Sequence, residues 1–162
     1  RRVLFRSLDQ FFSPLINKRT DAYNGYTLEG RTRIHMELIK GIRQVIGDKS
    51  LFALRLGGCD YTVGGTTIED AVWACRRFEE AGVDLLDISG GTCCYARKGH
   101  NYPGYFGDIS EAVKKEVHIP VLLTGGVRIV QDAEMLLKEE KADMIGVGRI
   151  ITAKPDWGME LI

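Results

Sequence analysis

Apolar residues follow two alternating patterns along this chain, and the alternation predicts a regular α/β arrangement. Four short apolar runs, each closed by glycine with polar or charged residues, have the length of buried strands: residues 51–56, 83–88, 118–123 and 142–147. Four segments with apolar residues three or four apart have the pattern of amphipathic helices: residues 34–46, 67–82, 108–117 and 130–140. Each predicted helix precedes a predicted strand.

Local signals mark the ends of several of these elements. Thr67 and Asp108 have the chemistry of helix N-caps, and Gly82 is placed to end the helix that Thr67 begins. The polar stretch 9–30 predicts a loop, and the tail from Ile150 predicts a further loop or helix.

Strands that are apolar on both faces are typical of a parallel sheet covered by helices, which places the chain in the α/β class. No strand-to-helix turn carries G-x-G-x-x-G, and paired glycines follow the last two strands, where many barrels bind phosphate. A complete (β/α)8 TIM barrel has eight strands in about 250 residues, whereas this chain of 162 residues supplies four. We therefore expect a partial barrel, formed by about the last four strands with their helices.

Two glycine motifs at the ends of the last two strands predict a phosphate site. The first is Gly125-Gly126-Val127, and the second is Gly148-Arg149. Glycine lets phosphate oxygens approach backbone N–H groups, the start of a following helix favours an anion, and an arginine adds a permanent positive charge. The alternative interpretation is that these glycines only form tight strand-to-helix turns.

Arg55 lies inside an apolar predicted strand, where a charge is costly to bury without a partner. We predict that it faces an anionic ligand or an electron-rich ring. The alternative is a structural ion pair with a neighbouring strand, for which Asp87 is the obvious partner.

Two long loops at the strand ends carry side chains that suit a substrate pocket. Cys59 and Tyr61 follow the first strand, and Tyr95 follows the second, so these three are the candidate substrate-binding residues. The adjacent Cys93–Cys94 pair lies in the second loop, and a redox or substrate-contact role for it stays open beside that of ordinary thiols.

Charge and composition exclude several classes of binding partner. The 22 basic residues balance the 22 acidic ones, which argues against a nucleic-acid-binding arm or a polybasic membrane anchor. A transmembrane helix needs about 18 consecutive apolar residues. No apolar run in this sequence is that long. The four cysteines form no C-x-x-C pair and the three histidines form no metal-ligand pattern, so we expect a cytoplasmic protein with reduced thiols and no metal.

The segment 11–21, which reads F-F-S-P-L-I-N-K-R-T-D, resembles the segment after the fourth barrel strand of old yellow enzyme-like NADH:flavin oxidoreductases. Residues 23–33 resemble that family's Y-G-G-S-x-E-N-R-x-R motif, with substitutions and one extra residue. The Arg55 strand and the two glycine motifs follow in the order and spacing of the family, so the resemblance covers about residues 8–158.

The resemblance implies a TIM barrel that binds FMN non-covalently, with NAD(P)H as reductant and an activated alkene or similar small molecule as hydride acceptor. It implies that Arg55 lies beside the flavin pyrimidine, where a cation stabilises negative charge on the reduced ring and raises its potential. It also implies that Gly126, Val127, Gly148 and Arg149 hold the FMN phosphate.

The family's anion-binding pair and its proton-donating tyrosine lie upstream of the phenylalanine–proline segment. By position they fall on Arg1, Leu4 and Arg6, and none of these has the matching chemistry, so the catalytic residues stay unknown. We therefore expect residues 1–7 to be unlike the family and residues 8–162 to form the C-terminal half of an FMN-binding barrel. Such a half requires the missing N-terminal half or a homo-oligomeric partner to complete it.

Two other functions stay open. One is a non-catalytic half-barrel that binds a phosphate ligand or pairs with another chain. The other is a flavin-free barrel enzyme that acts on a sugar phosphate, which needs a lysine or an acid inside the barrel at the strand ends. Asp87 is the one candidate, because it is the acid near the carboxyl end of a predicted strand.

Overall fold

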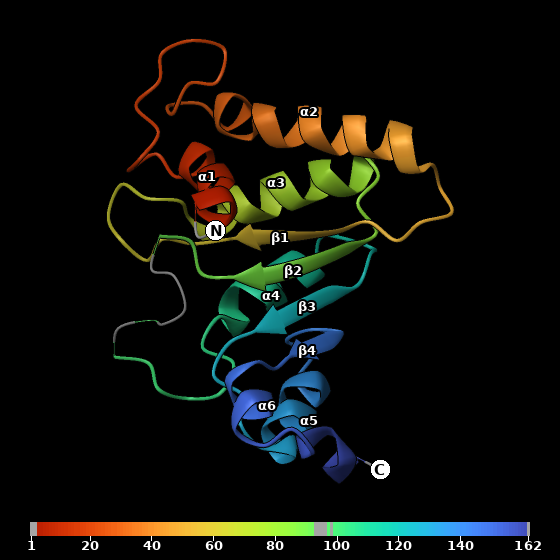
Figure 1. Cartoon of the computed structure of the whole chain (residues 1–162). Helices are drawn as coiled ribbons and strands as arrows, with labels where there is room; N and C mark the ends of the chain where they lie inside the picture. The colour runs from red at the N-terminus through yellow and green to blue at the C-terminus, as the bar shows by residue number, and fades with distance from the viewer. Residues whose placement is uncertain (1–2, 93–96, 98, 162) are drawn as a thin grey trace.

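The computed structural model describes residues 3–92, 97 and 99–161, and its centre is a four-stranded sheet. The strands lie in the order in which they occur along the chain, and every neighbouring pair is parallel. Their bounds are β1 Ala53–Gly57, β2 Leu85–Ser89, β3 Val121–Thr124 and β4 Met144–Gly146. All four therefore end at the same edge of the sheet (Figure 1). The predicted parallel α/β sheet is confirmed.

Helices alternate with the strands, as the apolar spacing predicts. The bounds are α2 Leu28–Ile46, α3 Ile68–Glu80, α4 Gly107–Lys114 and α5 Val130–Lys138. After β4 come the short helix α6, Arg149–Ala153, and the 3-10 turn η1, Trp157–Leu161. In Figure 1, α2 and α3 lie beside β1 at one end of the sheet, whereas α5 and α6 lie at the β4 end.

Capping residues explain where the helices begin and end. Thr67 caps α3 through a reciprocal box with Asp70, in which each side chain accepts a hydrogen bond from the other residue's backbone N–H. Thr27 caps α2 in the same position, so this helix begins before the apolar spacing becomes regular. Gly82 has a φ of +103°, a conformation that glycine adopts without steric cost, and the chain turns there from α3 toward β2.

Two local predictions were wrong. The predicted loop 9–30 is helical at both ends: residues 9–12 belong to an additional helix, α1 Val3–Phe12, and residues 28–30 belong to α2. The N-cap of α4 is Phe106 and not Asp108, because the Asp108 carboxylate accepts hydrogen bonds from the Tyr61 hydroxyl and the Arg97 guanidinium instead.

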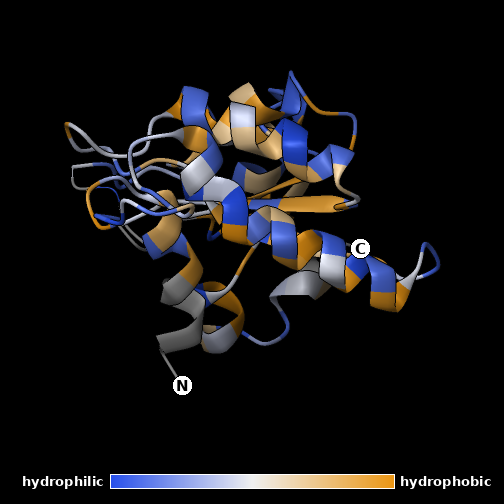
Figure 2. Cartoon of the chain, turned by 90° about the horizontal axis from the view of Figure 1, so that it is seen from above, coloured by the Kyte–Doolittle hydropathy of each residue, from blue (hydrophilic) through white to orange (hydrophobic). Residues whose placement is uncertain are grey.

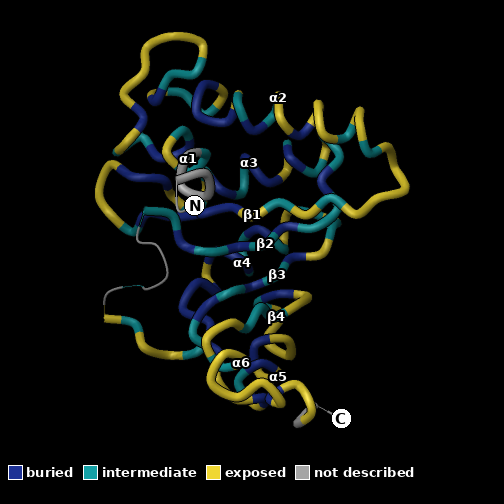
Figure 3. The backbone as a smooth tube through the Cα atoms, viewed as in Figure 1, coloured by how far each residue is buried: buried dark blue, intermediate teal, exposed yellow. Residues whose placement is uncertain are grey.

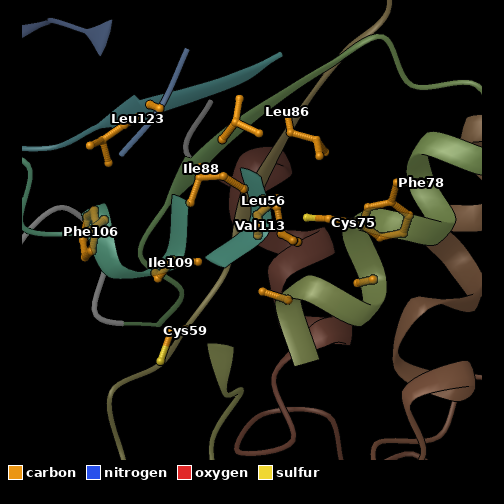
Figure 4. Packing of buried hydrophobic residues seen from close by; sticks show 14 of the residues in the cluster. Leu56, Cys59, Cys75, Phe78, Leu86, Ile88, Phe106, Ile109, Val113 and Leu123 are labelled. Carbon is orange, nitrogen blue, oxygen red and sulfur yellow. The ribbon is translucent and has the colours of Figure 1, made fainter. Parts of the chain in front are cut away.

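The two faces of the sheet differ in burial. One face packs on the helices through apolar side chains that are almost completely covered, among them Leu56, Leu86, Ile88 and Leu123 (Figure 4). The opposite face carries the row Arg55, Asp87, Leu122 and Met144, which lie side by side in the strand register. Met144 is 45% exposed on this face, and Figure 3 shows exposed positions along β1 beside buried ones. The sheet therefore has one covered face and one bare face.

The helices carry apolar and polar residues on different sides (Figure 2). Helix α2 departs from this pattern: its buried positions include Arg31 and His35, whereas three residues of its apolar stripe are exposed, namely Leu38, Ile42 and Val45. Among the described residues, no helix is both long enough and apolar enough to cross a membrane.

His35 is a polar residue inside the apolar layer between α1, α2 and α3. Its ring lies 6.2 Å from the Phe12 ring and 5.7 Å from the Phe78 ring, centroid to centroid. Burial lowers the pKa of His35 from 6.5 to about 4, because the charged imidazolium loses its hydration there. His35 is therefore neutral in the folded protein at pH 7.

We expect acid to destabilise the fold through His35. Between pH 6.5 and pH 4 the unfolded chain binds a proton at His35 that the folded chain does not, so this residue removes about 3 kcal/mol as the pH falls. His35→Leu cannot take up that proton. Its urea unfolding free energy should therefore rise relative to the unsubstituted chain over this window. His118→Leu, at a side chain that is 96% exposed, is the matched control, and equal pH profiles for all three chains would contradict the assignment.

Candidate functional site

A cavity of about 850 Å³ opens at the carboxyl edge of the sheet. The last residues of the strands on the bare face are small: Gly57 lies beside Ser89, and Thr124 lies beside Gly146. Small side chains at this level leave room above the sheet. The cavity is lined by residues at these strand ends, by the loops that follow them and by residues of α1.

Arg55 lines this cavity and lies two residues before Gly57, the last residue of β1. It lies on the bare face of β1 and not among the helices, and its side chain is 36% exposed. Its Nε lies 3.4 Å from Oδ2 of Asp87 on the adjacent strand. The Thr124 hydroxyl donates to Oδ1 of the same carboxylate at 2.7 Å. Arg55 therefore forms the ion pair with Asp87 that stood as the alternative interpretation, and it also lines the cavity as predicted.

The Gly125–Gly126 turn forms a second part of the wall. Gly126 has a φ of +74°, which favours glycine, and a Cβ atom there would lie 2.6 Å from the Tyr105 ring. The backbone N–H of Gly104 donates to the Gly125 carbonyl oxygen at 2.7 Å, so the preceding loop holds the turn. Val127 follows in the same wall.

Gly148 and Arg149 form a third part, after β4. A Cβ atom on Gly148 would meet no protein atom within 4 Å, so its backbone faces open space. Arg149 Nη2 donates to the Tyr105 hydroxyl at 3.3 Å. The helix that begins at Arg149 has only five residues, so the backbone amide and the guanidinium, rather than a helix dipole, dominate the charge at this point.

The structure brings together all of the residues predicted to bind the cofactor. Each of them lines the one cavity: Arg55, Gly125, Gly126, Val127, Gly148 and Arg149. Bare backbone at two turns, together with two guanidinium groups, suits an anionic ligand. The residues present thus fit a nucleotide with a phosphate at the β3–β4 end of the cavity and a polar ring nearer Arg55.

Asp9 of α1 also lines the cavity, and sequence reasoning misses it because residue 9 is grouped there with the polar stretch 9–30 instead of with the apolar residues of α1. Burial raises its pKa from 3.8 to about 6, although a hydrogen bond to the Gly57 backbone and the charge of Arg55 oppose the shift. Near neutral pH its charge disfavours folding, and protonation below pH 6 relieves that cost, which is opposite in sign to the effect of His35.

Asp60 connects three segments beside this cavity. Its carboxylate is buried and accepts hydrogen bonds from the Ser13 hydroxyl at 2.7 Å, the Thr66 N–H at 2.8 Å and the Thr92 N–H at 2.7 Å. Burial alone would raise the pKa of Asp60, but these donors outweigh it and leave the pKa below its usual value. The three segments are the α1–α2 connection and the loops after β1 and β2.

Two of the three candidate substrate-binding residues lie outside the lining of the cavity. Neither Cys59 nor Tyr61 is among the residues that line the cavity. The Tyr61 ring stacks on Phe106, with 6.1 Å between centroids, and its hydroxyl donates to Asp108 at 2.7 Å. These contacts give Tyr61 a structural role, and burial raises the pKa of the Cys59 thiol, so it is a poor nucleophile. Tyr95 and the Cys93–Cys94 pair lie outside the described residues.

In the part of the chain that the structure describes, no three histidine, cysteine or acidic side chains gather as a metal site would require. Cys59 and Cys75 are present there as thiols.

Comparison with known proteins agrees with this geometry. The model of the NADH:flavin oxidoreductase / NADH oxidase family matches residues 7–161. The chain belongs to this family. Two relatives in it are similar over most of this chain. The NADPH dehydrogenase of Halalkalibacterium halodurans is 37% identical over 157 residues, which are 94% of this chain and 44% of the relative. The NADH oxidase of Thermoanaerobacter brockii is 32% identical over 154 residues, which are 93% of this chain and 24% of the relative.

Solved structures are likewise similar to most of this chain but extend well beyond it. A 2-naphthoyl-CoA reductase in complex with 2-naphthoyl-CoA superimposes with a TM-score of 0.85 at 28% identity, over 95% of this chain and 24% of that one. Histamine dehydrogenase from Rhizobium sp. 4-9, at 23% identity and a TM-score of 0.77, shares the fold over 95% of this chain and 22% of its own. The chain thus spans less than half the length of these relatives and solved structures, and its fold is part of a TIM barrel.

Proposed function

We propose that this chain forms the FMN-binding part of an old yellow enzyme-like, NAD(P)H-dependent flavin oxidoreductase. In this assignment residues 8–162 are the C-terminal half of the barrel, and residues 1–7 lie outside the family pattern. The single observation that carries the proposal is the common cavity. Arg55, the Gly125–Gly126 turn and the Gly148–Arg149 turn come from three different strands and line one space.

Each group has a separate part in binding. The backbone N–H groups at Gly126, Val127 and Gly148 and the Arg149 guanidinium would hold the FMN phosphate. Arg55 would place a positive charge at the pyrimidine side of the ring, where it favours an electron-rich flavin. Asp87 and Thr124 orient Arg55 from below, since one carboxylate contacts both side chains.

When bound, FMN supplies hydride transfer from NAD(P)H to an activated alkene or a similar small acceptor, as in an ene-reductase. This chain contributes the charge and the shape of the site, and the proton donor of the whole protein would come from outside residues 8–162. The thiols at Cys59 and Cys75 are compatible with a reducing compartment, and we propose a cytoplasmic location.

The bare face of the sheet supports a further part of the proposal. Met144 is 45% exposed there, and Arg55 and Asp87 lie in the same row. Apolar residues on an open sheet face favour coverage by further structure. We propose that the N-terminal half of the barrel covers this face in the whole protein.

A second candidate is a non-catalytic half-barrel that binds a phosphate ligand and pairs through this face with another copy of the chain. The same bare face favours it, but the position of Arg55 in the cavity argues for a ligand with more than a phosphate. A phosphate-only site has no use for a cation at the far end of the cavity.

Titration of the purified chain with FMN and with riboflavin distinguishes the candidates. We expect FMN to bind with a shift of its visible absorption bands and quenching of its fluorescence, and to bind at least about tenfold more tightly than riboflavin, because one charge-assisted phosphate contact contributes about 1.5–3 kcal/mol. Subsequent anaerobic addition of NADH or NADPH should bleach the bound flavin. Binding of inorganic phosphate without binding of FMN would favour the second candidate and overturn the first.

A further inference from the structure

Tyr105 lies between the two glycine motifs and contacts both. A Cβ atom on Gly126 would lie 2.6 Å from Cε1 of the Tyr105 ring, and one on Gly125 would lie 3.2 Å from its Cε2. The ring therefore covers the side of the turn on which any larger residue would project. On the other motif, the Tyr105 hydroxyl accepts a hydrogen bond from Arg149 Nη2 at 3.3 Å.

The ring itself is held by the core. Tyr105 is 6% exposed, and it meets Phe106 edge to face with 4.6 Å between centroids. Phe106 is 1% exposed and belongs to the main apolar cluster. The bond from the Gly104 N–H to the Gly125 carbonyl oxygen ties the same loop to the turn. Tyr105 is therefore a fixed point between the Gly125–Gly126 turn and the long Arg149 side chain.

The hydrogen bond from Arg149 to Tyr105 restricts the orientation of the long Arg149 side chain. Arg149 lies in an exposed position at the start of α6, and a free arginine side chain loses rotamer entropy when a ligand immobilises it. A guanidinium has five N–H donors in a rigid fork, so one bond to a phenol oxygen leaves the others for a phosphate. An arginine that is already oriented loses less entropy when the anion arrives.

We propose that Tyr105 is a positioning residue for the phosphate site, whose ring shapes the Gly125–Gly126 turn and whose hydroxyl holds Arg149 toward it. This inference rests on the proposed function, because it assumes that the two motifs share one phosphate. It assigns a site role to a residue that belongs to neither motif and that lies between β2 and α4.

The test uses the whole chain and two ligands that differ only in the phosphate. Tyr105→Phe keeps the ring and removes the hydroxyl, so we expect FMN affinity to fall about fivefold, the size of one net hydrogen bond, while riboflavin affinity changes less than about twofold. Tyr102→Phe is the matched control, because the Tyr102 hydroxyl contacts His100 and its side chain does not line the cavity. That variant should bind both ligands as the unsubstituted chain does.

A double-mutant cycle identifies the partner. In an Arg149→Gln background, Tyr105→Phe should have no further effect on FMN affinity, because the side chain that the hydroxyl orients is gone. Equal losses for FMN and riboflavin, or additive losses in the cycle, would overturn the positioning role. If the unsubstituted chain does not prefer FMN to riboflavin, the proposed function fails first; if it does and Tyr105→Phe retains that preference in full, only this inference fails.

Discussion

Replacement of Asp60 by alanine is expected to cost about 4 kcal/mol of unfolding free energy, because it leaves several buried donors unpaired at once. The residue is 2% exposed, and its carboxylate accepts bonds from Ser13, Thr66 and Thr92. Alanine leaves all three donors without their acceptor. Urea unfolding at pH 7 measures the loss, and Asp48→Ala, at an exposed loop acid, is the control.

Asp60→Asn separates charge from shape. The amide keeps one acceptor oxygen but turns an NH2 group toward a donor, so we expect about half of the alanine effect. Because the folded pKa of Asp60 is lowered, its contribution is present above the unfolded pKa of about 3.9 and is lost as the pH falls further. The gap between the unsubstituted chain and Asp60→Asn should therefore narrow below about pH 4. A gap that is constant with pH would contradict a role for the carboxylate charge.

Gly148→Ala is expected to lower FMN affinity by about 10- to 100-fold, the value of one hydrogen bond to a charged group, while changing stability by less than about 1 kcal/mol. The added methyl meets no protein atom within 4 Å, so the folded chain accommodates it. It projects instead where a phosphate would approach the backbone. Fluorescence titration with FMN, together with urea unfolding, checks both halves of this expectation.

Gly158→Ala is the matched control for that experiment. A methyl group added at Gly158 would also meet no protein atom within 4 Å, but this glycine lies in η1 and does not line the cavity. The substitution should leave FMN affinity unchanged. If Gly148→Ala binds FMN as tightly as Gly158→Ala does, the phosphate does not approach the turn after β4, and that part of the proposed site is wrong.

The cavity combines groups that serve different ends of one ligand. Arg55 is oriented from the sheet by Asp87 and Thr124, whereas Arg149 is oriented from a loop by Tyr105. Both guanidinium groups are thus held by a second side chain before any ligand arrives. Such preorganisation lowers the entropic cost of binding and makes the site specific for charge at two separate points.

Much of the fold could be predicted from local patterns. The strands end within one residue of their predicted ends, and the Thr67 cap and the Gly82 turn lie where the sequence signals place them. These signals depend on residues near one another in the chain, such as apolar spacing and capping chemistry. Helix α1 escapes them because its last four residues are grouped with the polar stretch 9–30 and its first ones with residues 1–7, which are unlike the family; in the structure Phe12 packs against the core.

The sequence by itself determined the order of the elements from α2 to β4, the parallel sheet and the candidate anion-binding groups, because each depends on short-range pattern. Only the tertiary structure decided which side chains meet. Ser13 lies 47 residues from Asp60 and Tyr105 lies 44 from Arg149, yet each pair is hydrogen-bonded. It also placed Tyr61 away from the cavity and brought Asp9 to it. Contacts over such separations depend on how the helices and loops pack on the sheet, and no local pattern encodes them.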